Sequence, residues 1–385
     1  MRILHIYRTY YPDSQGGIQE AIRQICLATQ AHGVQSRILT LSPNPTPLKL
    51  PFPEGEVIRS RSWMAPASCD MGGLNSLIEY QRLIKWADVI HYHFPWPFLD
   101  ILQLSNFSKK PSVLTYHSDI VKQRFLKRLY SPLMHHTLRA MSIIIATSPN
   151  YLESSPVLRK YFSKGKVTVI PLGISRPQAN FETSNASDEE YLNQIGVKSG
   201  HYLLFLGVLR HYKGVHSLVS VAQSVQGKIV IAGDGPEIKA LMQLSNHYQL
   251  KNVVFLGEVT EHHKHLLLQH CTALVLPSQL RSEAFGMVLI EASMHAKAMI
   301  CCELGSGTSY VNIHGLTGLV VPPKNPAALS EACNQLLNNP TLAKKMGHAA
   351  LERYESLFSA NSLGKSHVDV YSQVIGISPK KPSFR

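Results

Sequence analysis

Two cationic residues in the second half of the chain have the chemistry needed to hold a phosphorylated ligand. Arg210 and Lys213 lie in Gly207-Val-Leu-Arg210-His-Tyr-Lys213-Gly214, directly after an apolar run that is typical of a strand. Arginine offers a planar fork of N–H donors and lysine a point charge, so together they can hold a diphosphate. Taken alone, the segment can also be a surface turn with incidental charges.

Two carboxylates, Glu283 and Glu291, flank the start of a predicted helix. They delimit Glu283-Ala-Phe-Gly-Met-Val-Leu-Ile-Glu291, which follows the apolar run 273–276. The start of a helix carries partial positive charge and unpaired N–H groups, which favour a bound phosphate. Glu283 precedes this start and Glu291 lies about two turns inside the helix. The two carboxylates can therefore contact different parts of one extended ligand.

A third loop with possible binding chemistry follows another apolar run. It reads Ile231-Ala-Gly233-Asp-Gly235-Pro236, and its glycines permit a tight turn or a close approach of the backbone to a ligand. The segment is neither a Walker A loop nor a complete GxGxxG fingerprint. ATPase and dinucleotide chemistry therefore receive little support.

Short apolar runs alternate with helix-length segments along the whole chain. This pattern is typical of parallel sheets with crossover helices, and 385 residues exceed the size of a single core. The sequence therefore predicts an α/β fold with two Rossmann-like domains. The predicted strands are 3–7, 36–41, 89–93, 112–116, 143–147 and 167–170 in the first domain, and 202–206, 228–232, 253–256, 273–276 and 299–302 in the second.

Composition shifts predict the domain boundaries. The first domain covers residues 1–175, and a polar stretch rich in asparagine and serine makes 176–200 a linker. The second domain covers 201–355. A helix over 356–373 is expected to pack back on the N-terminal domain, and residues 374–385 form a basic tail.

Positive charge is concentrated in the first half of the chain. Residues 1–175 hold 20 Lys and Arg against 10 Asp and Glu, whereas the remainder holds 18 against 15. The excess is densest over 122–139, where basic and apolar residues interleave. Such a segment suits an anionic membrane surface. Nucleic acid is the competing partner, and a solvated helix face is the alternative without a partner.

The remaining sequence features predict neither a membrane span nor a metal site. No run supplies the roughly 18 apolar residues that a span needs. The N-terminal residues 1–7 are typical of a buried strand and not of a secretion signal. The six cysteines show no CxxC pair or metal-ligand spacing, so reduced, buried thiols are expected.

The assembly resembles the family 4 retaining glycosyltransferases of the GT-B fold over nearly the whole chain, through the E-x7-E motif from Glu283 to Glu291. The resemblance implies two Rossmann-like domains that face each other across a cleft. It implies that Glu291 binds the ribose hydroxyls of a nucleotide sugar and that Glu283 contacts the donor sugar. It also implies that Arg210 and Lys213 neutralise the leaving diphosphate in place of a metal ion.

The N-terminal domain carries two further segments similar to that family. The loop Tyr11-Pro-Asp-Ser-Gln-Gly16-Gly17-Ile18 resembles the loop that closes near the donor phosphate and the acceptor. His117, at the end of a predicted strand, resembles the active-site histidine beside the transferred sugar. A lone histidine at a strand end is otherwise usually structural.

The resemblance thus assigns acceptor binding to the first domain and nucleotide-sugar binding to the second. The predicted catalytic residues are His117 and Glu283. The predicted donor-binding residues are Gly16, Gly17, Arg210, Lys213, Gly233, Glu283, Phe285, Gly286, Met287, Val288 and Glu291, with the backbone of Met287 and Val288 near the pyrophosphate.

The implied mechanism is transfer with retention and without a protein nucleophile. The diphosphate leaves, an oxocarbenium-like centre develops, and the acceptor hydroxyl attacks from the same face and gives its proton to the departing phosphate. The protein then supplies orientation and charge stabilisation. A double displacement with Glu283 or Asp119 as nucleophile is the less favoured alternative.

The segment 303–312 departs from the commoner family pattern and is similar to bacterial mannosyl- and rhamnosyltransferases that build O-antigen. The expected reaction is transfer of mannose or D-rhamnose from a GDP-linked donor such as GDP-mannose, without a separate cofactor. The expected acceptor is a lipid-linked oligosaccharide at the cytoplasmic face of the plasma membrane, with no nucleic acid as partner. The alternatives are a UDP-sugar-dependent glycosyltransferase, a nucleotide-sugar epimerase and a nucleic-acid-binding protein.

Overall fold

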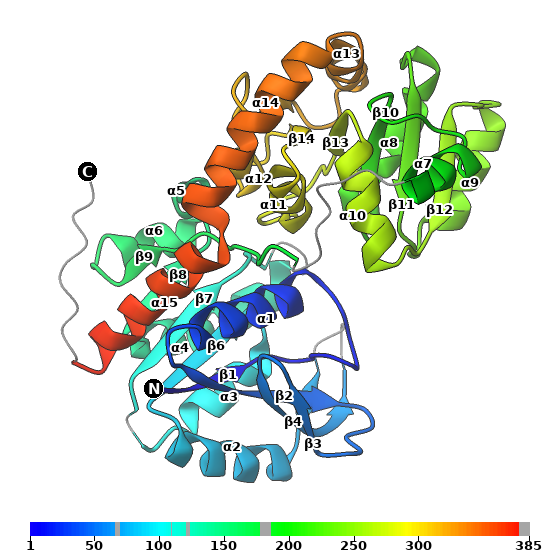
Figure 1. Ribbon diagram of the computed structural model, residues 1–385. Coiled ribbons are helices and arrows are strands. Elements are labelled where there is room, and N and C mark those ends of the chain that lie inside the picture. Colours follow the sequence, from blue (N-terminus) through cyan, green and yellow to red (C-terminus); the bar gives the residue numbers. More distant parts are fainter. Residues whose placement is uncertain (66–69, 109, 121–123, 178–185, 377–385) are drawn as a thin grey trace. The chain divides into compact units, whose positions relative to one another are not determined.

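The chain folds into two compact units. The computed structural model describes residues 1–65, 70–108, 110–120, 124–177 and 186–376 (Figure 1). Met1–Ser175 and Ser359–Arg385 form the first unit, and Arg176–Phe358 form the second. The first segment of the first unit ends at Ser175, where the composition predicts the end of the first domain, and the C-terminal residues return to this unit. Each unit contains one sheet.

The sheet of the first unit is parallel except at one edge. Its strands follow the order β3-β4-β2-β1-β6-β7-β8-β9, with β3 and β5 antiparallel to β4. The direction of strand progression reverses between β1 and β6, and ligands bind at such switch points in open α/β sheets. The strands are β1 Arg2–Ile6, β2 Gln35–Ser42, β3 Lys49–Phe52, β4 Gly55–Met64, β5 Met71–Gly72, β6 Val89–Phe94, β7 Ser112–Tyr116, β8 Ile143–Ala146 and β9 Val167–Val169.

The last helix of the chain packs on the first helix of the same unit (Figure 1). A Cβ at Gly364 would lie 2.4 Å from the carbonyl oxygen of Ala28, so the glycine allows the two helices to approach closely. Leu363 and Tyr371 join the core that the first sheet builds. The helices of this unit are α1 Gly17–Gln30, α2 Leu74–Trp86, α3 Pro97–Leu104, α4 Arg124–Ala140, α5 Pro149–Ser154, α6 Pro156–Phe162 and α15 Ala360–Val374.

The sheet of the second unit is entirely parallel. Its order is β12-β11-β10-β13-β14-β15, so the switch point lies between β10 and β13. The strands are β10 Tyr202–Leu206, β11 Lys228–Ala232, β12 Val253–Gly257, β13 Ala273–Leu276, β14 Ala298–Cys302 and β15 Gly318–Val321. The helices are α7 Ala186–Gln194, α8 Val215–Ser220, α9 Ile238–His247, α10 Glu261–His270, α11 Met287–Met294, α12 Thr308–Val311, α13 Pro326–Leu337 and α14 Pro340–Arg353, with shorter helical turns at η2 His211–Lys213, η3 Ala222–Ser224 and η4 Tyr354–Phe358.

Several boundaries differ from the sequence predictions. The predicted linker 176–200 contains helix α7, while residues 178–185 lie outside the described part. The C-terminal helix begins at Ala360 and not at 356, because the turn η4 ends α14 first. Most of the predicted basic tail, 377–385, also lies outside the described residues.

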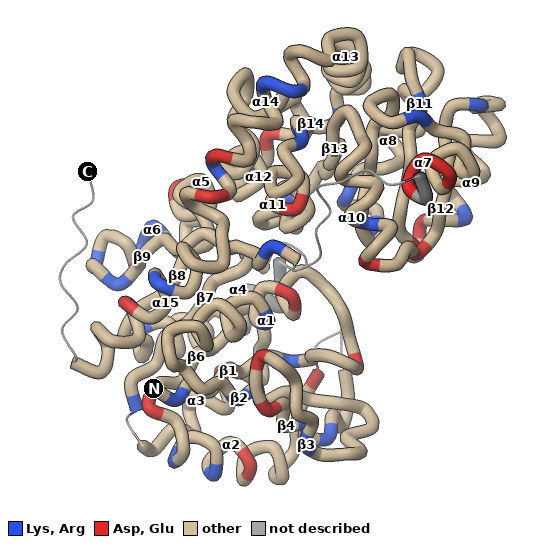
Figure 2. The backbone as a smooth tube through the Cα atoms, in the orientation of Figure 1, with Lys and Arg blue, Asp and Glu red and all other residues tan. Residues whose placement is uncertain are grey.

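Basic residues are spread over both units (Figure 2). The basic segment predicted over 122–139 falls largely on α4, and the side chains of 121–129 lie outside the described part. Five cysteines are free and buried, as expected for reduced thiols, and Cys69 lies in the undescribed stretch 66–69. Of the described helices, none is both long and apolar enough to cross a membrane.

The core of the first unit contains several histidines. β1 and β6 place His5, His91 and His93 in the interior with no exposed surface, and α15 adds His367. Burial disfavours the charged imidazolium, so it lowers the pKa of His5 to about 3 and that of His367 to about 4. It also holds the pKa of His91 and His93 well below the ordinary value. These imidazoles are therefore neutral at pH 7.

The first unit should lose stability in mild acid. Each of these histidines has a folded pKa below its unfolded value, so the unfolded chain binds more protons once the pH falls below about 6.5. Between pH 6.5 and its folded pKa, each buried histidine therefore lowers the free energy of unfolding by up to about 1.4 kcal/mol for every pH unit of acidification. Urea unfolding at pH 7 and pH 5.5, followed by tryptophan fluorescence, measures the loss. Trp63, Trp86 and Trp96 are the three tryptophans of the chain and all belong to the first unit.

The variant His367→Leu serves as the control for this acid sensitivity. It removes one buried group that titrates on unfolding, so its stability should fall less steeply between pH 7 and pH 5.5 than that of the wild type. The same steepness in both proteins would contradict the assignment of the acid loss to these histidines.

Candidate functional site

The loops that follow β10 and β13 contact each other at the switch point of the second sheet. Gly214 adopts a left-handed conformation with φ 70°, and a Cβ there would lie 2.0 Å from the carbonyl oxygen of Pro277. The backbone N–H of Gln279 donates to the carbonyl of Tyr212 at 2.9 Å. A glycine is therefore required for the two loops to meet.

This contact brings together two residues that the sequence predicted as part of one site. Lys213 Nζ lies 3.1 Å from Glu283 Oε2, and their side chains are only 14% and 11% exposed. The hydroxyl of Ser278 donates to the same carboxylate oxygen at 3.3 Å. Burial alone would lower the pKa of Lys213, but the Glu283 carboxylate and the neighbouring Tyr212 together outweigh it and raise that pKa. Lys213 is therefore a cation at neutral pH.

Glu283 leads into the amino end of α11. The hydroxyl of Ser306 donates to the backbone carbonyl of Glu283 at 2.9 Å, which holds the loop. Gly286 precedes the helix with φ 83°, and Met287 and Val288 are its first two residues. The first N–H groups of a helix have no acceptor within it, so they remain available to a ligand. The amino end of α11, where such N–H groups lie, therefore follows Glu283 by only a few residues.

Phe285 is buried and packs against other parts of the second unit. It is 4% exposed, and a Cβ at Gly307 would lie 2.5 Å from its ring, so the segment before α12 packs on it. Its ring also meets that of Phe358 edge to face, with centroids 6.2 Å apart. Phe285 therefore supports the loop that carries Glu283.

Arg210 and Gly233 occupy neighbouring loops. Arg210 is exposed, and its charge lies close enough to Lys213 to act against the raised pKa of that lysine. Gly233 has φ 134°, and a Cβ there would lie 2.2 Å from the carbonyl oxygen of Gly207. The absence of a side chain at Gly233 therefore lets the loops after β10 and β11 pack together.

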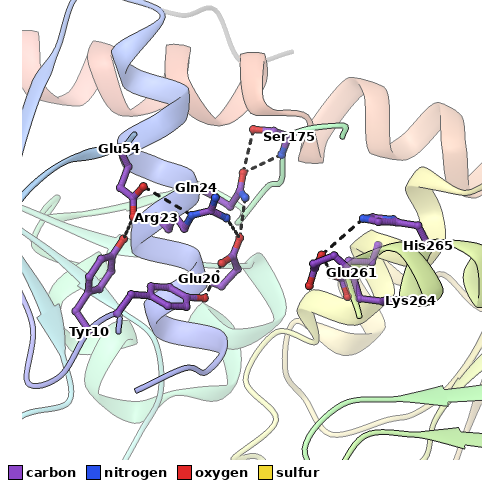
Figure 3. Close-up of polar contacts among 11 residues, drawn as sticks. Tyr10, Glu20, Arg23, Gln24, Glu54, Ser175, Glu261, Lys264 and His265 are labelled. Atoms are coloured by element: carbon purple, nitrogen blue, oxygen red, sulfur yellow. Dashed lines mark hydrogen bonds and ion pairs between the residues drawn. The ribbon is translucent and has the colours of Figure 1, made fainter. Parts of the chain in front are cut away.

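Glu291 lies within α11 and has a cationic partner that the sequence did not indicate. Lys264 Nζ lies 2.9 Å from Glu291 Oε1 and 2.7 Å from Glu261 Oε2. Figure 3 shows Lys264 on α10 beside Glu261 and His265. The carboxylates outweigh the effect of burial and raise the pKa of Lys264. Glu291 is therefore held beside a protonated lysine.

Three residues of this region escaped the sequence prediction. Ser278 could have been found, because it follows directly after a predicted strand, where ligand-binding loops begin. Ser306 lies in the segment 303–312 that departs from the family pattern. Lys264 could not have been predicted as a site residue, because no sequence motif includes it.

In the first unit, Gly16 and Gly17 lie at the start of α1. Gly16 has φ 175°, which is extended backbone, and a Cβ there would come 2.9 Å from the amide oxygen of Gln19. A Cβ at Gly17 would meet no atom within 4 Å. The Gln19 amide donates to the hydroxyls of Thr9 and Ser14 at 3.2 and 3.0 Å and so holds the loop. The backbone at Gly17 therefore borders open space.

A network of hydrogen bonds and ion pairs lies next to the loop that precedes α1 (Figure 3). The Tyr10 hydroxyl donates to the buried Glu54 carboxylate at 2.9 Å, and the Tyr11 hydroxyl donates to Glu20 at 2.8 Å. Arg23 lies 3.4 Å from Glu20 and 3.7 Å from Glu54. Tyr11 is thereby tied to α1, and the preceding Tyr10 is tied to the turn between β3 and β4.

His117 follows β7 and is 4% exposed. Its Nε2 lies 3.0 Å from Nδ1 of His93, whose Nε2 lies 3.1 Å from Nδ1 of His5. Burial lowers the pKa of His117 to about 3. His117 is therefore a neutral imidazole at the end of a chain of buried imidazoles.

Three of these imidazoles are also close enough to surround a metal ion. Ring nitrogens of His5, His91 and His93 lie within 4.8 Å of one another, and no other such group occurs in the described part of the chain. However, Nδ1 and Nε2 of His91 are bonded to the hydroxyls of Tyr371 and Thr115, both at 2.7 Å. A metal ion would have to break these hydrogen bonds, so the donor set does not fit one.

The predicted residues thus divide between the units. Gly16, Gly17 and His117 belong to the first, and all the others belong to the second. The second unit joins Lys213 and Glu283 directly, whereas Glu291 has its own partner on α10.

Comparison with known proteins covers nearly the whole chain. Residues 15–176 match "Glycosyltransferase Family 4" and residues 187–353 match "Glycosyl transferases group 1". The chain is 42% identical to D-rhamnosyltransferase WbpZ of Pseudomonas aeruginosa, over 94% of this chain and 93% of that protein. It is 36% identical to O-antigen chain mannosyltransferase C of Escherichia coli, over 97% and 99%.

Solved structures share the fold at low sequence identity. Sucrose-phosphate synthase from Thermosynechococcus elongatus has a TM-score of 0.79 at 23% identity, covering 98% of this chain and 100% of that one. Anabaena Alr3699/HepE in complex with UDP and glucose has a TM-score of 0.75 at 18% identity, covering 97% and 100%. The predicted fold of two Rossmann-like domains is confirmed. The chain therefore belongs to the family 4 retaining glycosyltransferases of the GT-B fold, enzymes that transfer a sugar from a nucleotide-sugar donor.

Proposed function

We propose that this glycosyltransferase transfers mannose or D-rhamnose from a GDP-linked donor to a lipid-linked oligosaccharide in O-antigen synthesis. The observation that carries the proposal is the identity of 42% and 36%, along almost the full chain, to relatives named for D-rhamnose and mannose transfer. The geometry of the second unit supplies groups suited to such a donor.

The diphosphate of the donor is assigned to Lys213, Arg210 and the amino end of α11. Lys213 is cationic and 14% exposed, and its partner Glu283 leads into the start of α11, whose first N–H groups have no acceptor within the helix. Positive charge placed there stabilises the diphosphate as it leaves, so the reaction needs no metal ion and no separate cofactor. In the free enzyme, Glu283 balances the buried charge of Lys213.

Glu283 and Glu291 are assigned to the sugar and the ribose. Ser278 and Lys213 hold one oxygen of Glu283, which leaves its carboxylate oriented before the donor binds. Lys264 orients Glu291 in the same way, so that carboxylate can accept hydrogen bonds from two adjacent hydroxyls.

The proposed chemistry retains the anomeric configuration without a protein nucleophile. The carboxylate of Glu283 is engaged by a cation and a hydroxyl, which lowers its nucleophilicity. The departing phosphate takes the proton of the acceptor hydroxyl. The protein contributes orientation and positive charge.

The acceptor is assigned to the first unit, at the cytoplasmic face of the plasma membrane. Residues 1–175 hold 20 basic against 10 acidic residues, a balance that suits an anionic surface. The open space at Gly17 supports an acceptor or donor group near the start of α1.

A donor screen tests the proposal. Purified enzyme is incubated with GDP-mannose, GDP-D-rhamnose and UDP-sugars, each with a lipid-linked oligosaccharide, and the released nucleotide and the product anomer are measured. We expect release of GDP and an α-linked product. Release of UDP alone would favour a UDP-sugar-dependent enzyme of the same fold, and conversion of the donor without acceptor would favour an epimerase.

Removing the cation of the proposed diphosphate site should weaken nucleotide binding. Lys213→Met should raise the Kd for GDP roughly 10- to 100-fold, since a hydrogen bond to a charged group contributes about 1.5–3 kcal/mol. Isothermal titration calorimetry measures this change.

The single variant leaves Glu283 buried beside an apolar side chain, which costs stability. The double variant Lys213→Met/Glu283→Gln removes both charges and serves as the matched control for folding. It should regain stability without regaining affinity for GDP. Unchanged GDP affinity in both variants would refute the diphosphate assignment.

The ribose assignment can be tested with a nucleotide that lacks the hydroxyls. The wild type should bind GDP more tightly than 2′,3′-dideoxy-GDP, because Glu291 accepts hydrogen bonds from the ribose. In Glu291→Gln this preference should shrink by about tenfold. Calorimetry with both ligands on both proteins measures it, and an undiminished preference would rule out the proposed contact.

A further inference from the structure

Three buried imidazoles form a continuous hydrogen-bonded chain in the first unit. His5 on β1 contacts His93 on β6 at 3.1 Å between ring nitrogens, and His93 contacts His117 after β7 at 3.0 Å. Both pairs of rings are stacked, with interplanar angles of 19° and 23°. The register of β1 and β6, which pairs His5 with His91, brings the rings to one face of the sheet.

The protons in this chain must all point in the same direction. Burial lowers the pKa of each of the three imidazoles well below neutral, so each ring has one N–H group and one lone pair. Each N–H must meet the lone pair of the next ring. Two arrangements satisfy this condition: protons that point towards His117, or protons that point towards His5.

The buried end of the chain distinguishes the two arrangements. Nε2 of His5 is inaccessible, and no hydrogen-bond partner for it occurs among the described residues. If the protons pointed towards His5, this atom would be an orphaned N–H, whereas the opposite direction leaves only a bare lone pair. In the protein backbone, orphaned buried N–H groups are rarer than under-satisfied carbonyl acceptors, and we apply the same preference to the ring nitrogen of His5. The favoured direction therefore has His5 donating to His93 and His93 donating to Nε2 of His117.

Two neighbouring buried histidines have hydrogen-bond partners of their own. His91 stacks on His93 at 4.3 Å, but both its nitrogens are occupied by Tyr371 and Thr115. Nδ1 of His367 is bonded to the backbone carbonyl of Leu363 at 2.9 Å. These hydrogen bonds of His91 and His367 therefore go to groups outside the chain from His5 to His117.

We propose that His93, supported by His5, is a positioning residue that fixes the tautomer of His117 with its proton on Nδ1. His117 then donates a hydrogen bond from Nδ1 to an oxygen of the bound ligand, a sugar hydroxyl or a phosphate, and does not take up a proton there. The catalytic meaning of this tautomer rests on the proposed function, whereas the tautomer itself is a property of the free enzyme.

Nitrogen NMR of the free enzyme tests the tautomer without any substrate. The protein is labelled with 15N-histidine, and the His117 signals are assigned by their absence in His117→Gln. We expect a protonated Nδ1 and an unprotonated Nε2. The opposite tautomer would overturn the proposal, and so would one zinc ion bound per chain in the purified enzyme, because the metal would occupy the lone pairs.

Two substitutions at His93 separate the hydrogen bond from packing. In His93→Gln the amide oxygen can accept from His5 and the amide N–H can donate to His117, so the Nδ1 tautomer and most of kcat should be kept. In His93→Met the thioether can only accept. This variant should show an increased Nε2–H population and a kcat lowered roughly 10- to 100-fold, with the KM for the donor nearly unchanged.

His91→Met is the matched control, because His91 is equally buried on the same strand but its two ring nitrogens are bonded to Tyr371 and Thr115 and not to His117. It should lose stability as His93→Met does, yet keep the His117 tautomer and the wild-type kcat. Equal losses of kcat in the two methionine variants, or a pure Nδ1 tautomer in His93→Met, would leave His93 with a packing role only and overturn the proposal. If the wild type transfers no sugar from any donor, the proposed function fails while the NMR result still decides the tautomer.

Discussion

The contact between the loops after β10 and β13 is the constraint on which the candidate donor site depends. The reversal of strand order places these loops side by side, and Gly214 lets one backbone reach the carbonyl of Pro277. Only then can Lys213 and Glu283 form a buried pair. Each charge makes the other tolerable in the interior, since a single buried charge costs several kcal/mol. The site is therefore part of what holds the two loops together.

The sequence predicted most of this framework for a physical reason. Parallel strands buried on both faces give continuous apolar runs, and the loops after them carry the functional residues. Residue type and position were therefore enough to single out Lys213 and Glu283. Their pairing, and that of Glu291 with Lys264, could not be predicted. Which side chains meet across a sheet depends on strand order and helix placement, and neither is encoded in local periodicity.

The buried histidines show the opposite case. Val89-Ile-His-Tyr-His93 was predicted as a strand, but nothing in the alternation indicated that both of its histidines would be wholly enclosed. Their hydrogen-bond partners come from β1, the end of β7 and α15, which are distant in sequence. A polar residue in the core is stable only when its partners are present, and those partners belong to the tertiary structure.

Buried polar groups at the two switch points are stabilised in different ways. In the second unit, the charges of Lys213 and Glu283 are paired. This pairing suits the proposal that Lys213 exchanges one anionic partner, Glu283, for another, the diphosphate of the donor. In the first unit, burial keeps the imidazoles neutral, so they can be linked only by directional hydrogen bonds. A neutral chain carries no net charge, yet its hydrogen bonds still orient its terminal ring. Burial therefore determines the acid sensitivity of this core, and together with the hydrogen bonds from His5 through His93 it determines the donor character proposed for His117.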